Sequence, residues 1–293
     1  MIIEGTSRCT LACPACPRTW FADKFDRPFP KHDLDIDEFS RFMDCESGRQ
    51  VGNFTFNGNH GDVIYWPQLF DFLEIFKNKR FTISTNGSHQ RPEFWKKLST
   101  HLKVGDTVFF SIDGLEDTNG LYRRNADWNS IMQAIDIMRH SDATLVWKSI
   151  VFSSNQHQQE QMADLANSFG MKFVSDLTNR FGDESLRPNE NLTLTNRKPD
   201  VTVTKIEPRC SKLEYVSADG YYWPCCMISS MFTLHKTPLW KQRDDWRLIH
   251  NQNLDQAREK LETFKKIMLA DPHVVCQMHC KVGQQGENWS RMN

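Results

Sequence analysis

Three cysteines near the start of the chain are spaced to bind one inorganic cluster. Cys9, Cys13 and Cys16 follow the short apolar start Met1-Ile2-Ile3. Three thiols so close together cannot all pair as disulfides, but their thiolates can converge on a soft metal centre. A cubane of four irons takes one ligand per iron, so three cysteines leave one iron open to bind a substrate or cofactor and pass it an electron. For this spacing alone, the alternative is a zinc knuckle or an incidental cysteine cluster.

Alternating strand and helix patterns follow the cysteine loop, and these elements must position the other residues of a site built on the cysteines. Residues 17–34 show no period and are predicted to be a loop, in which Arg18, Trp20 and Phe21 are candidates for substrate contact or for surface packing. Asp35 as N-cap, with Glu38 three residues on and an apolar stripe after it, predicts a helix that begins at residue 35 and ends at Cys45. From Gly52 onward, predicted strands alternate with predicted helices. The strands are 53–57, 81–85, 107–112, 144–152 and 171–174, and the helices lie around 67–76, 92–98, 131–138 and 162–169.

This alternation predicts a parallel sheet with right-handed crossovers, so functional residues should lie at the carboxyl ends of the strands. Polar loops with glycine stand at three of those ends, at residues 57–62, 85–87 and 113–114. Ordinary turn chemistry explains any one of these loops. Their order along the chain, together with the cysteine loop, points to a known family.

The chain resembles the radical S-adenosylmethionine (radical SAM) enzymes, whose N-terminal loop carries Cys-x-x-x-Cys-x-x-Cys. Residues 61–67 resemble the Gly-Glu-Pro loop of that family, 83–87 its strand ending in Thr-Asn-Gly, and 111–114 its Ser-x-Asp-Gly strand end. The resemblance covers about residues 1–178 and implies the partial (β/α)6 barrel of the family, an α/β, TIM-like fold open on one side. The chain departs from the pattern at three positions, Ala15 for an aromatic residue, Asp62 for Glu and Val63 for Pro.

The resemblance implies two cofactors. The N-terminal cysteines hold a [4Fe–4S] cluster whose open iron chelates SAM, and reduction by a flavodoxin- or ferredoxin-like donor cleaves SAM to methionine and a 5′-deoxyadenosyl radical. It also implies that Asp62 contacts the SAM amino group and that Arg123, or its neighbour Arg124, binds the carboxylate. Spacing does not separate the two arginines, and a solvated basic pair is the alternative. The other SAM-binding residues implied by the resemblance are Gly61, Ser84, Asn86, Ser111 and Asp113.

A second group of cysteines lies in the C-terminal part of the chain. We expect a core domain at 1–178, a polar bridge at 179–205 and a second domain at 206–293. A predicted hairpin around Ala218-Asp219-Gly220 brings Cys210 and Cys225 together, and Cys276 and Cys280 follow a predicted helix at 246–270. Four thiolates make a closed site for zinc or for an iron–sulfur cluster, and the residues alone do not choose between the two.

The spacing of Cys210, Gly220 and Cys225 resembles the opening of the SPASM domain. The number of cysteines matches its shorter form, called twitch, which carries one auxiliary [4Fe–4S] cluster. The resemblance thus implies that Cys210, Cys225, Cys276 and Cys280 ligate a second cluster for electron transfer. Cys226 is left over and is a candidate catalytic hydrogen-atom donor, with a spare or alternative ligand as the other interpretation. Cys45 is predicted to be a buried structural thiol.

Composition excludes several classes of function. The chain has 293 residues, a net charge of −1 and a pI of about 6.8, which argues against a polybasic nucleic-acid binder. No apolar run is long enough to span a membrane, and the N-terminus is not a signal peptide. We therefore expect a cytoplasmic protein, in which clustered cysteines bind metal rather than form disulfides.

Together these features predict a radical SAM enzyme that abstracts hydrogen from a substrate in an oxidation, a crosslink or an epimerisation. Relatives with such C-terminal domains often act on peptides, and some act on sugars or other small molecules. Because no recognition domain for a leader peptide is evident before Cys9, we expect a peptide substrate with only a slight preference over a small molecule. The rival from another class is a non-catalytic metal-binding or electron-carrier protein. It needs no SAM pocket, so Gly61, Asp62, Ser111 and Arg123 should then not converge on the cysteines. A nucleic-acid-modifying enzyme would need a basic face.

Overall fold

The structure, a computed structural model, describes residues 1–178, 181, 183–189, 205–206, 214–223, 225–226, 229, 244–270 and 281–282. The chain divides into two compact units. The first comprises residues 1–36, 51–194 and 217–219, and the second comprises residues 37–50, 195–216 and 220–293.

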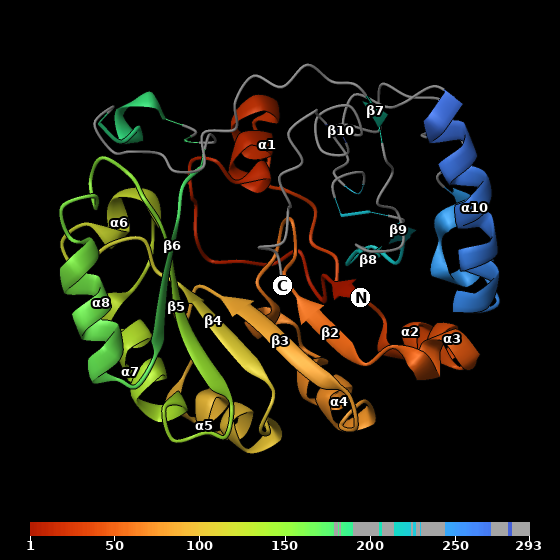
Figure 1. The fold of residues 1–293 in the computed structure, drawn as a ribbon, viewed down its shortest axis with the longest axis horizontal. Coiled ribbons are helices and arrows are strands. Elements are labelled where there is room, and N and C mark those ends of the chain that lie inside the picture. The colour runs from red at the N-terminus through yellow and green to blue at the C-terminus, as the bar shows by residue number, and fades with distance from the viewer. Residues whose placement is uncertain are drawn as a thin grey trace. The chain divides into compact units, whose positions relative to one another are not determined.

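A parallel sheet is the centre of the first unit (Figure 1). Each of its strands is parallel to the next, as the strand–helix alternation predicts. In order, the strands are β1 (Ile2–Ile3), β2 (Asn53–Phe56), β3 (Arg80–Thr85), β4 (Thr107–Ser111), β5 (Thr144–Ile150) and β6 (Lys172–Asp176). The connecting helices are α4 (Leu69–Ile75), α5 (Pro92–His101), α7 (Trp128–Met138) and α8 (Gln159–Ser168). The predicted α/β class is confirmed.

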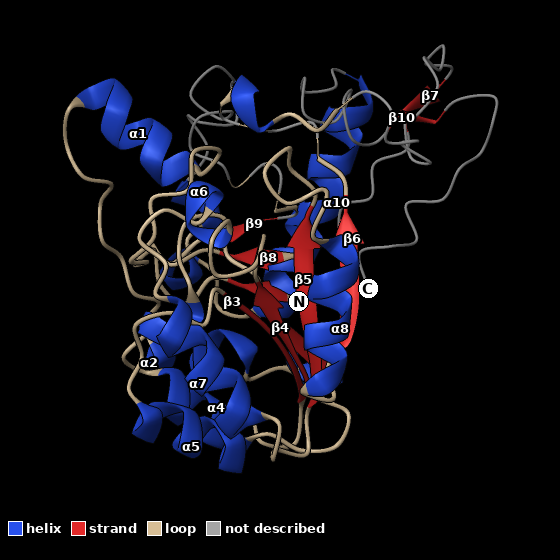
Figure 2. Ribbon diagram, turned by 90° about the vertical axis from the view of Figure 1, so that its left-hand side faces the viewer, coloured by secondary structure: helices blue, strands red, loops and turns tan. Residues whose placement is uncertain are grey.

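Strand residues alternate between two faces of this sheet. The buried ones pack as one apolar layer with helix residues such as Phe72 and Trp95; on β2 to β4 they are Phe54, Phe56, Phe81, Ile83, Val108 and Phe110. Helices α4, α5 and α7 lie together on one side of the strands (Figure 2). The intervening residues of these strands are half-buried, and they are Asn53, Thr55, Thr82, Ser84, Thr107, Phe109 and Ser111. Because successive side chains point to opposite faces, the second face is mostly polar and partly accessible.

The segment after the cysteine loop differs from its prediction. Residues Pro17–Phe25 form helix α1, so the loop predicted for 17–34 was wrong over its first half. Only Phe21 is buried in this helix, which leaves no apolar stripe for periodicity to detect. The available signal was Pro17 at the first helical position, where proline is favoured because its missing N–H has no helical partner.

Short helical elements complete the first unit. They lie in the connections after β2, after β4 and after β6. These are the 3-10 helices η1 (Val63–Tyr65) and η2 (Glu184–Leu186), and the α-helix α6 (Asn119–Tyr122). The second of the predicted polar loops, at residues 85–87, contains Gly87 with φ of 73°, a left-handed conformation that glycine adopts without strain.

The second unit is built from a hairpin and helices. Strands β8 (Tyr215–Val216) and β9 (Tyr222–Trp223) pair antiparallel, which confirms the predicted hairpin, and β7 (Lys205–Ile206) pairs antiparallel with β10 (Lys281–Val282). The other elements are α2 (Ile36–Met43), α3 (Glu46–Gln50), η4 (Leu248–His250) and α10 (Leu254–Ala270). The Phe42 ring packs on Tyr222 at 5.6 Å between centroids. Cys45 is 6% exposed and accepts a hydrogen bond from the Gly48 N–H, so its prediction as a buried thiol is confirmed.

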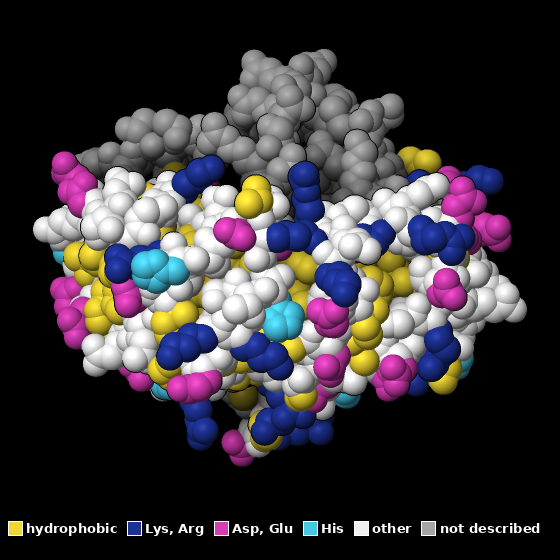
Figure 3. All heavy atoms as spheres, turned by 90° about the horizontal axis from the view of Figure 1, so that it is seen from below, with side chains coloured by type: hydrophobic (Ala, Val, Ile, Leu, Met, Phe, Trp, Pro, Cys, Tyr) yellow, Lys and Arg dark blue, Asp and Glu magenta, His cyan; other side chains and the backbone are white. Residues whose placement is uncertain are grey.

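Two features of the described residues concern nucleic-acid binding and membrane insertion. On the face in Figure 3, Lys and Arg side chains are interspersed with Asp and Glu, with no continuous basic stripe among the residues described there. Within the described ranges, no helix is both long enough and apolar enough to cross a membrane.

Candidate functional site

The three N-terminal cysteines lie between β1 and α1. The Cys16 N–H donates to the Cys13 carbonyl at 3.0 Å, which closes a turn directly before α1. All three are half-buried thiols. Burial raises the pKa of Cys9 to about 12, and Asp62 and Cys13 add to this rise. Burial also raises the pKa of Cys13, with a contribution from Cys16. The loop thus gathers three thiols within electrostatic reach of one another.

Arg18 clamps the loop from the first turn of α1. Its Nη1 donates to the Cys9 carbonyl at 2.9 Å, and its Nη2 donates to the Leu11 carbonyl at 2.5 Å. The positive charge opposes the effect of burial on the pKa of Cys9 and favours the thiolate. Arg18 therefore faces the cysteine loop, while Trp20 on the same helix is 43% exposed.

Asp62 joins the loop after β2 to the end of β3. It is 6% exposed, and its Oδ2 accepts hydrogen bonds from Thr85 Oγ1 at 3.0 Å, Asn86 N at 2.7 Å and Asn86 Nδ2 at 2.6 Å. Its Oδ1 accepts one from Ile64 N at 3.3 Å. Burial raises the pKa of Asp62 to about 6, although the N–H groups of Asn86 and Ile64 favour its ionised form.

The same network reaches the cysteine loop. Asn86 Nδ2 lies 3.5 Å from Cys9 Sγ, and the Asp62 N–H donates to the Arg8 carbonyl at 2.9 Å. At Gly61, a Cβ atom would lie 1.7 Å from the Thr6 carbonyl oxygen, so no larger residue fits there without moving the backbone. The structure therefore brings Gly61, Asp62 and Asn86 together beside Cys9.

The end of β4 supplies a buried ion pair next to Cys13. Arg123 Nε lies 2.5 Å from Asp113 Oδ2, and Asp113 Oδ1 accepts a hydrogen bond from Ile150 N at 2.6 Å. Burial alone would lower the pKa of Arg123, but Asp113 and Cys13 raise it above its usual value. Arg123 in turn lowers the pKa of Cys13 against the effect of burial, so the guanidinium lies close to this thiol. Asp113 is fully buried and fixes the arginine beside the thiol.

Burial distinguishes Arg123 from Arg124. The Arg123 side chain is 20% exposed, whereas that of Arg124 is 51% exposed and lies 3.9 Å from Asp183. Arg124 instead holds the cysteine loop through its backbone, because its carbonyl accepts a hydrogen bond from the Ala12 N–H at 3.0 Å.

The two predicted serines lie on the half-buried face of the sheet. Ser84 pairs in register with Phe109, and Ser111 pairs with Lys148. Both side chains are half-buried, and Ser111 ends β4 two residues before Asp113. Both serines therefore lie on the half-buried face of the sheet, close to the carboxyl ends of their strands.

The second predicted cluster site is only partly within the described chain. Cys225 and Cys226 are half-buried and belong to the second unit. Three of its predicted ligands, Cys210, Cys276 and Cys280, lie outside the described residues.

The donor set of the N-terminal loop fits a four-iron cluster. In the part of the chain that the structure describes, no three His, Cys, Asp or Glu side chains close around a single metal ion. A [4Fe–4S] cluster does not need that, because each thiolate binds a different iron. A closed zinc site needs four ligands, and this loop provides three thiols. The Arg18 clamp and the Asn86 amide near Cys9 Sγ supply the hydrogen-bonding shell that a thiolate site needs.

Sequence reasoning missed Glu4, which directly follows β1. It is 3% exposed and accepts hydrogen bonds from the N–H groups of His60 and Gly61. The available signal was a carboxylate that directly follows two apolar residues at the end of a strand, since a buried charge needs partners.

Comparisons with known proteins agree with this site. The family description "Radical SAM superfamily" matches residues 3–166, while no curated protein sequence matches the chain. The fold is similar to that of Streptococcus suis SuiB bound to S-adenosylmethionine, with a TM-score of 0.56 and 12% identity over 85% of this chain and 67% of that one. For SuiB bound to its precursor peptide SuiA, the TM-score is 0.57 at 12% identity, over 84% of this chain and 64% of that one.

A third similar structure is anSMEcpe with bound AdoMet and the Cp18Cys peptide. Its TM-score is 0.53 at 15% identity, over 92% of this chain and 81% of that one. At such identities the similarity shows the fold alone. The family match, however, spans more than half of the chain and includes the cysteine loop and the strand ends around it. The chain therefore belongs to the radical SAM superfamily, a superfamily of SAM-dependent enzymes that carry a [4Fe–4S] cluster.

Proposed function

We propose that this enzyme abstracts hydrogen from a peptide substrate and passes an electron to a second, auxiliary [4Fe–4S] cluster. One observation carries the assignment of the SAM site, namely that residues from three strand ends converge on the thiols. Asn86 Nδ2 lies 3.5 Å from Cys9 Sγ, and the Arg123 guanidinium lies close enough to Cys13 to lower the pKa of its thiol. A non-catalytic metal-binding protein would have no use for this convergence.

The roles of the residues follow from their contacts. Cys9, Cys13 and Cys16 would hold the cluster, which together with SAM supplies a 5′-deoxyadenosyl radical for hydrogen abstraction. Arg123 is the proposed partner of the SAM carboxylate, because Asp113 binds its Nε at 2.5 Å and thereby fixes the plane of the guanidinium.

Asp62 is the proposed partner of the SAM amino group. Its Oδ2 already accepts three hydrogen bonds, so the ammonium contact falls to Oδ1, which has one bond of 3.3 Å to Ile64 N. Asn86 and Gly61 hold this carboxylate and its loop against the cysteines. Ser84 and Ser111 are proposed to contact the polar groups of SAM from the half-buried face.

A peptide substrate is supported by the fold neighbours. The SuiB and anSMEcpe structures similar to this chain contain peptides. The half-buried face of the sheet offers hydroxyl groups and a charged pair, Lys148 and Asp176, with Nζ and Oδ2 3.2 Å apart. Such a polar surface suits the amide groups of a peptide. The proposed outcome is an oxidation, a crosslink or an epimerisation.

The auxiliary cluster is supported by the strand pairing in the second unit. Hairpin β8–β9 ends at Trp223, two residues before Cys225. In the antiparallel pair β7–β10, the carboxyl end of β7 lies beside the amino end of β10. Cys210 follows β7 by four residues and Cys280 directly precedes β10 in the sequence. We assign Cys210, Cys225, Cys276 and Cys280 as ligands and Cys226 as a hydrogen-atom donor.

The proposed setting is the cytoplasm, where thiols stay reduced and a flavodoxin- or ferredoxin-like protein supplies electrons. The assignment is tested with anaerobically reconstituted protein, by quantifying iron and sulfide and then adding SAM and dithionite. We expect about eight irons for two clusters, and formation of 5′-deoxyadenosine. About four irons with turnover would remove the auxiliary cluster, and zinc without SAM cleavage would reject the whole function. Stimulation of 5′-deoxyadenosine formation by sugars instead of peptides would reject the substrate class.

A further inference from the structure

Glu4 holds the loop that follows β2 by its backbone. The neighbouring residue, Ile3, pairs in register with Phe56 and shares its apolar side of the sheet, so Glu4 points to the opposite face. Its Oε1 accepts hydrogen bonds from His60 N at 2.5 Å and from Gly61 N at 3.1 Å. One buried carboxylate oxygen thus fixes two successive peptide groups of the loop, directly before Asp62.

The His60 ring packs against the same carboxylate. Its Nδ1 lies 3.3 Å from Glu4 Oε2, and its side chain is 8% exposed. The ring stacks on Phe29 at 4.6 Å between centroids. Burial alone would raise the pKa of Glu4, but His60 and the loop N–H groups lower it below its usual value. Glu4 is therefore ionised at neutral pH despite its burial.

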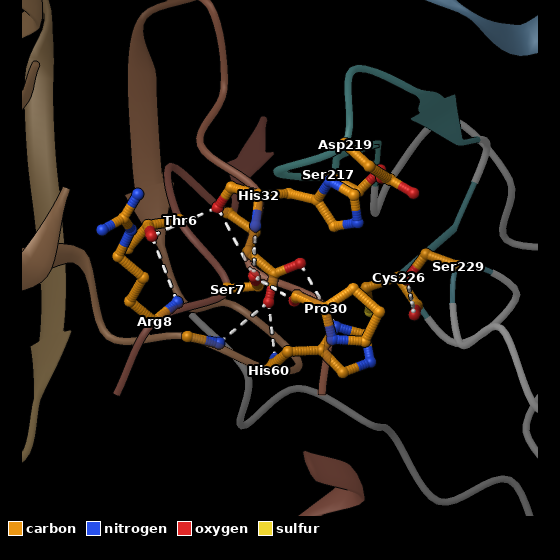
Figure 4. Close-up of polar contacts among 12 residues, drawn as sticks. Thr6, Ser7, Arg8, Pro30, His32, His60, Ser217, Asp219, Cys226 and Ser229 are labelled. Atoms are coloured by element: carbon orange, nitrogen blue, oxygen red, sulfur yellow. Dashed lines mark hydrogen bonds and ion pairs between the residues drawn. The ribbon is translucent and has the colours of Figure 1, made fainter. Parts of the chain in front are cut away.

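The loop packs closely against the segment 4–8, with no room for a side chain between them at two of its glycines. A Cβ atom at Gly58 would lie 2.8 Å from Glu4 Oε1, and one at Gly61 would clash with the Thr6 carbonyl. On its other side the segment is bound to residues 30–32, since Ser7 N donates to the His32 carbonyl and Ser7 Oγ donates to the Pro30 carbonyl, both at 2.9 Å (Figure 4). The segment 4–8 leads directly into Cys9, so it joins the loop 57–62 to the cysteine loop.

We propose that Glu4 is a positioning residue for SAM, which aligns the loop 57–62 with the cysteine loop so that Gly61 and Asp62 face the SAM amino group. This inference rests on the proposed function of the site. A buried charge is unfavourable unless it is satisfied by hydrogen bonds. The donors that satisfy Glu4 are the N–H groups of His60 and Gly61, which belong to a loop and not to a strand. Charged acceptors hold N–H donors about twice as strongly as neutral ones. The carboxylate therefore supplies rigidity that an amide at this position does not match.

The test is the affinity of the reconstituted holoenzyme for SAM after the substitution Glu4→Gln. Calorimetry gives the Kd for SAM, and electron paramagnetic resonance of the reduced cluster reports the spectral change that SAM causes. We expect the Kd to rise about tenfold, as for loss of a charged hydrogen-bond acceptor, and the SAM-dependent spectral change to weaken at a fixed SAM concentration. Iron content should stay at the wild-type level.

Glu214→Gln is the matched control. Glu214 is also a buried glutamate, 5% exposed, and it accepts hydrogen bonds from Arg258 and Tyr222 in the second unit. This variant should lose thermal stability and keep the wild-type Kd for SAM. It therefore separates a general loss of stability from a loss of loop position.

Two results would overturn the inference. Either Glu4→Gln binds SAM with the wild-type Kd and spectral change, or it loses iron and affinity in parallel, which would mean a purely structural role. If Glu4→Gln does not fold, Gly58→Ala presses a methyl group on the same carboxylate, and it must also raise the Kd. A wild-type protein that binds no SAM rejects the proposed function itself, which distinguishes that failure from failure of the Glu4 inference alone.

Discussion

Each unit of the molecule contains an arginine paired with a buried carboxylate. In the first unit, Arg123 binds Asp113 through one bond, with Nε and Oδ2 2.5 Å apart. In the second unit, Arg258 binds Glu214 through two bonds, at 2.7 and 2.8 Å. The second pair has the better geometry, because a bidentate contact uses both carboxylate oxygens. Only the first pair lies beside a cysteine of the cluster motif.

The difference lies in the third partner of each pair. Tyr222 donates its hydroxyl to Glu214 Oε1 at 2.7 Å, so that network joins the hairpin β8–β9 to α10. The second oxygen of Asp113 instead accepts a hydrogen bond from the backbone of β5, and Arg123 lies within electrostatic reach of Cys13. An arginine paired with a buried carboxylate therefore does not by itself identify a functional site. What distinguishes Arg123 is the further group near it, the thiol of Cys13. The following experiments test that distinction.

The largest expected effect is that of Cys13→Ala. Loss of one of three thiolates should abolish the SAM-binding cluster, so iron content falls by about four atoms per chain and 5′-deoxyadenosine is no longer formed. Iron and sulfide assays and product chromatography measure both. Cys45→Ala is the control, because Cys45 is buried outside the loop; it should cost roughly 1 kcal/mol of stability and keep the iron. Full iron content in Cys13→Ala would contradict the ligand assignment.

The next largest effect is expected for Arg123, and the same substitution at Arg258 serves as its comparison. Arg123→Met should raise the Kd for SAM by at least about tenfold, because it removes the proposed carboxylate partner. Arg258→Met should leave that Kd unchanged and lower the free energy of unfolding by roughly 2 kcal/mol, since Glu214 loses a charged hydrogen-bond partner. Calorimetry and urea unfolding give the two quantities.

Arg123→Lys sharpens the same comparison. It keeps the charge but loses the planar donor group that Asp113 orients, so its Kd for SAM should fall between those of wild type and Arg123→Met. Equal effects of Arg123→Met and Arg258→Met on SAM binding would remove the distinction between the two pairs.

The sequence alone was enough to predict the positions of the site loops, for a physical reason. Strands with apolar residues at alternate positions and helices between them specify a parallel sheet, and such a sheet gathers its carboxyl ends at one edge. The alternation therefore places Asn86 and Asp113 at one edge of the sheet, and the resemblance to the radical SAM family implies that this edge faces the cysteines. The hydrogen bond between Asn86 and Cys9, and the effect of Arg123 on the pKa of Cys13, agree with that placement.

Other features had no periodic signal. Helix α1 buries only Phe21, so no stripe marked it as a helix. Glu4 is a single charge after a strand of two residues, and its role depends on a loop 56 positions away. Arg123 and Arg124 are adjacent in sequence, and only their burial in the folded chain, 20% against 51% side-chain exposure, separates them.

A smaller effect is expected at Arg18, which binds the loop without holding a ligand itself. Arg18→Met removes the donors to the Cys9 and Leu11 carbonyls and a positive charge near the cluster. The midpoint potential of the cluster should become more negative, because the reduced form gains negative charge. Arg18→Lys should restore most of the potential while still losing iron faster than wild type, since one ammonium does not span both carbonyls as the guanidinium does. An unchanged potential in Arg18→Met, measured by a redox titration, would show that the arginine acts on loop shape alone.

The smallest expected effect is that of Asp255→Asn in the second unit. Asp255 Oδ1 accepts the Ser47 N–H at 3.1 Å, at the first turn of α3, and the hydrogen bonds from Ser47 lower the pKa of Asp255. Because the folded pKa lies below the unfolded value of about 3.9, this contribution is fully present above that pH and is lost as pH falls through the folded pKa. Thermal unfolding should therefore show a slightly lower Tm for Asp255→Asn at pH 7, and a difference from wild type that shrinks below about pH 4. The variant should keep the wild-type Kd for SAM. A changed Kd would mean that polar contacts of the second unit also affect SAM binding. The contrast drawn between the two ion pairs would then hold for those pairs alone and not for the two units as a whole.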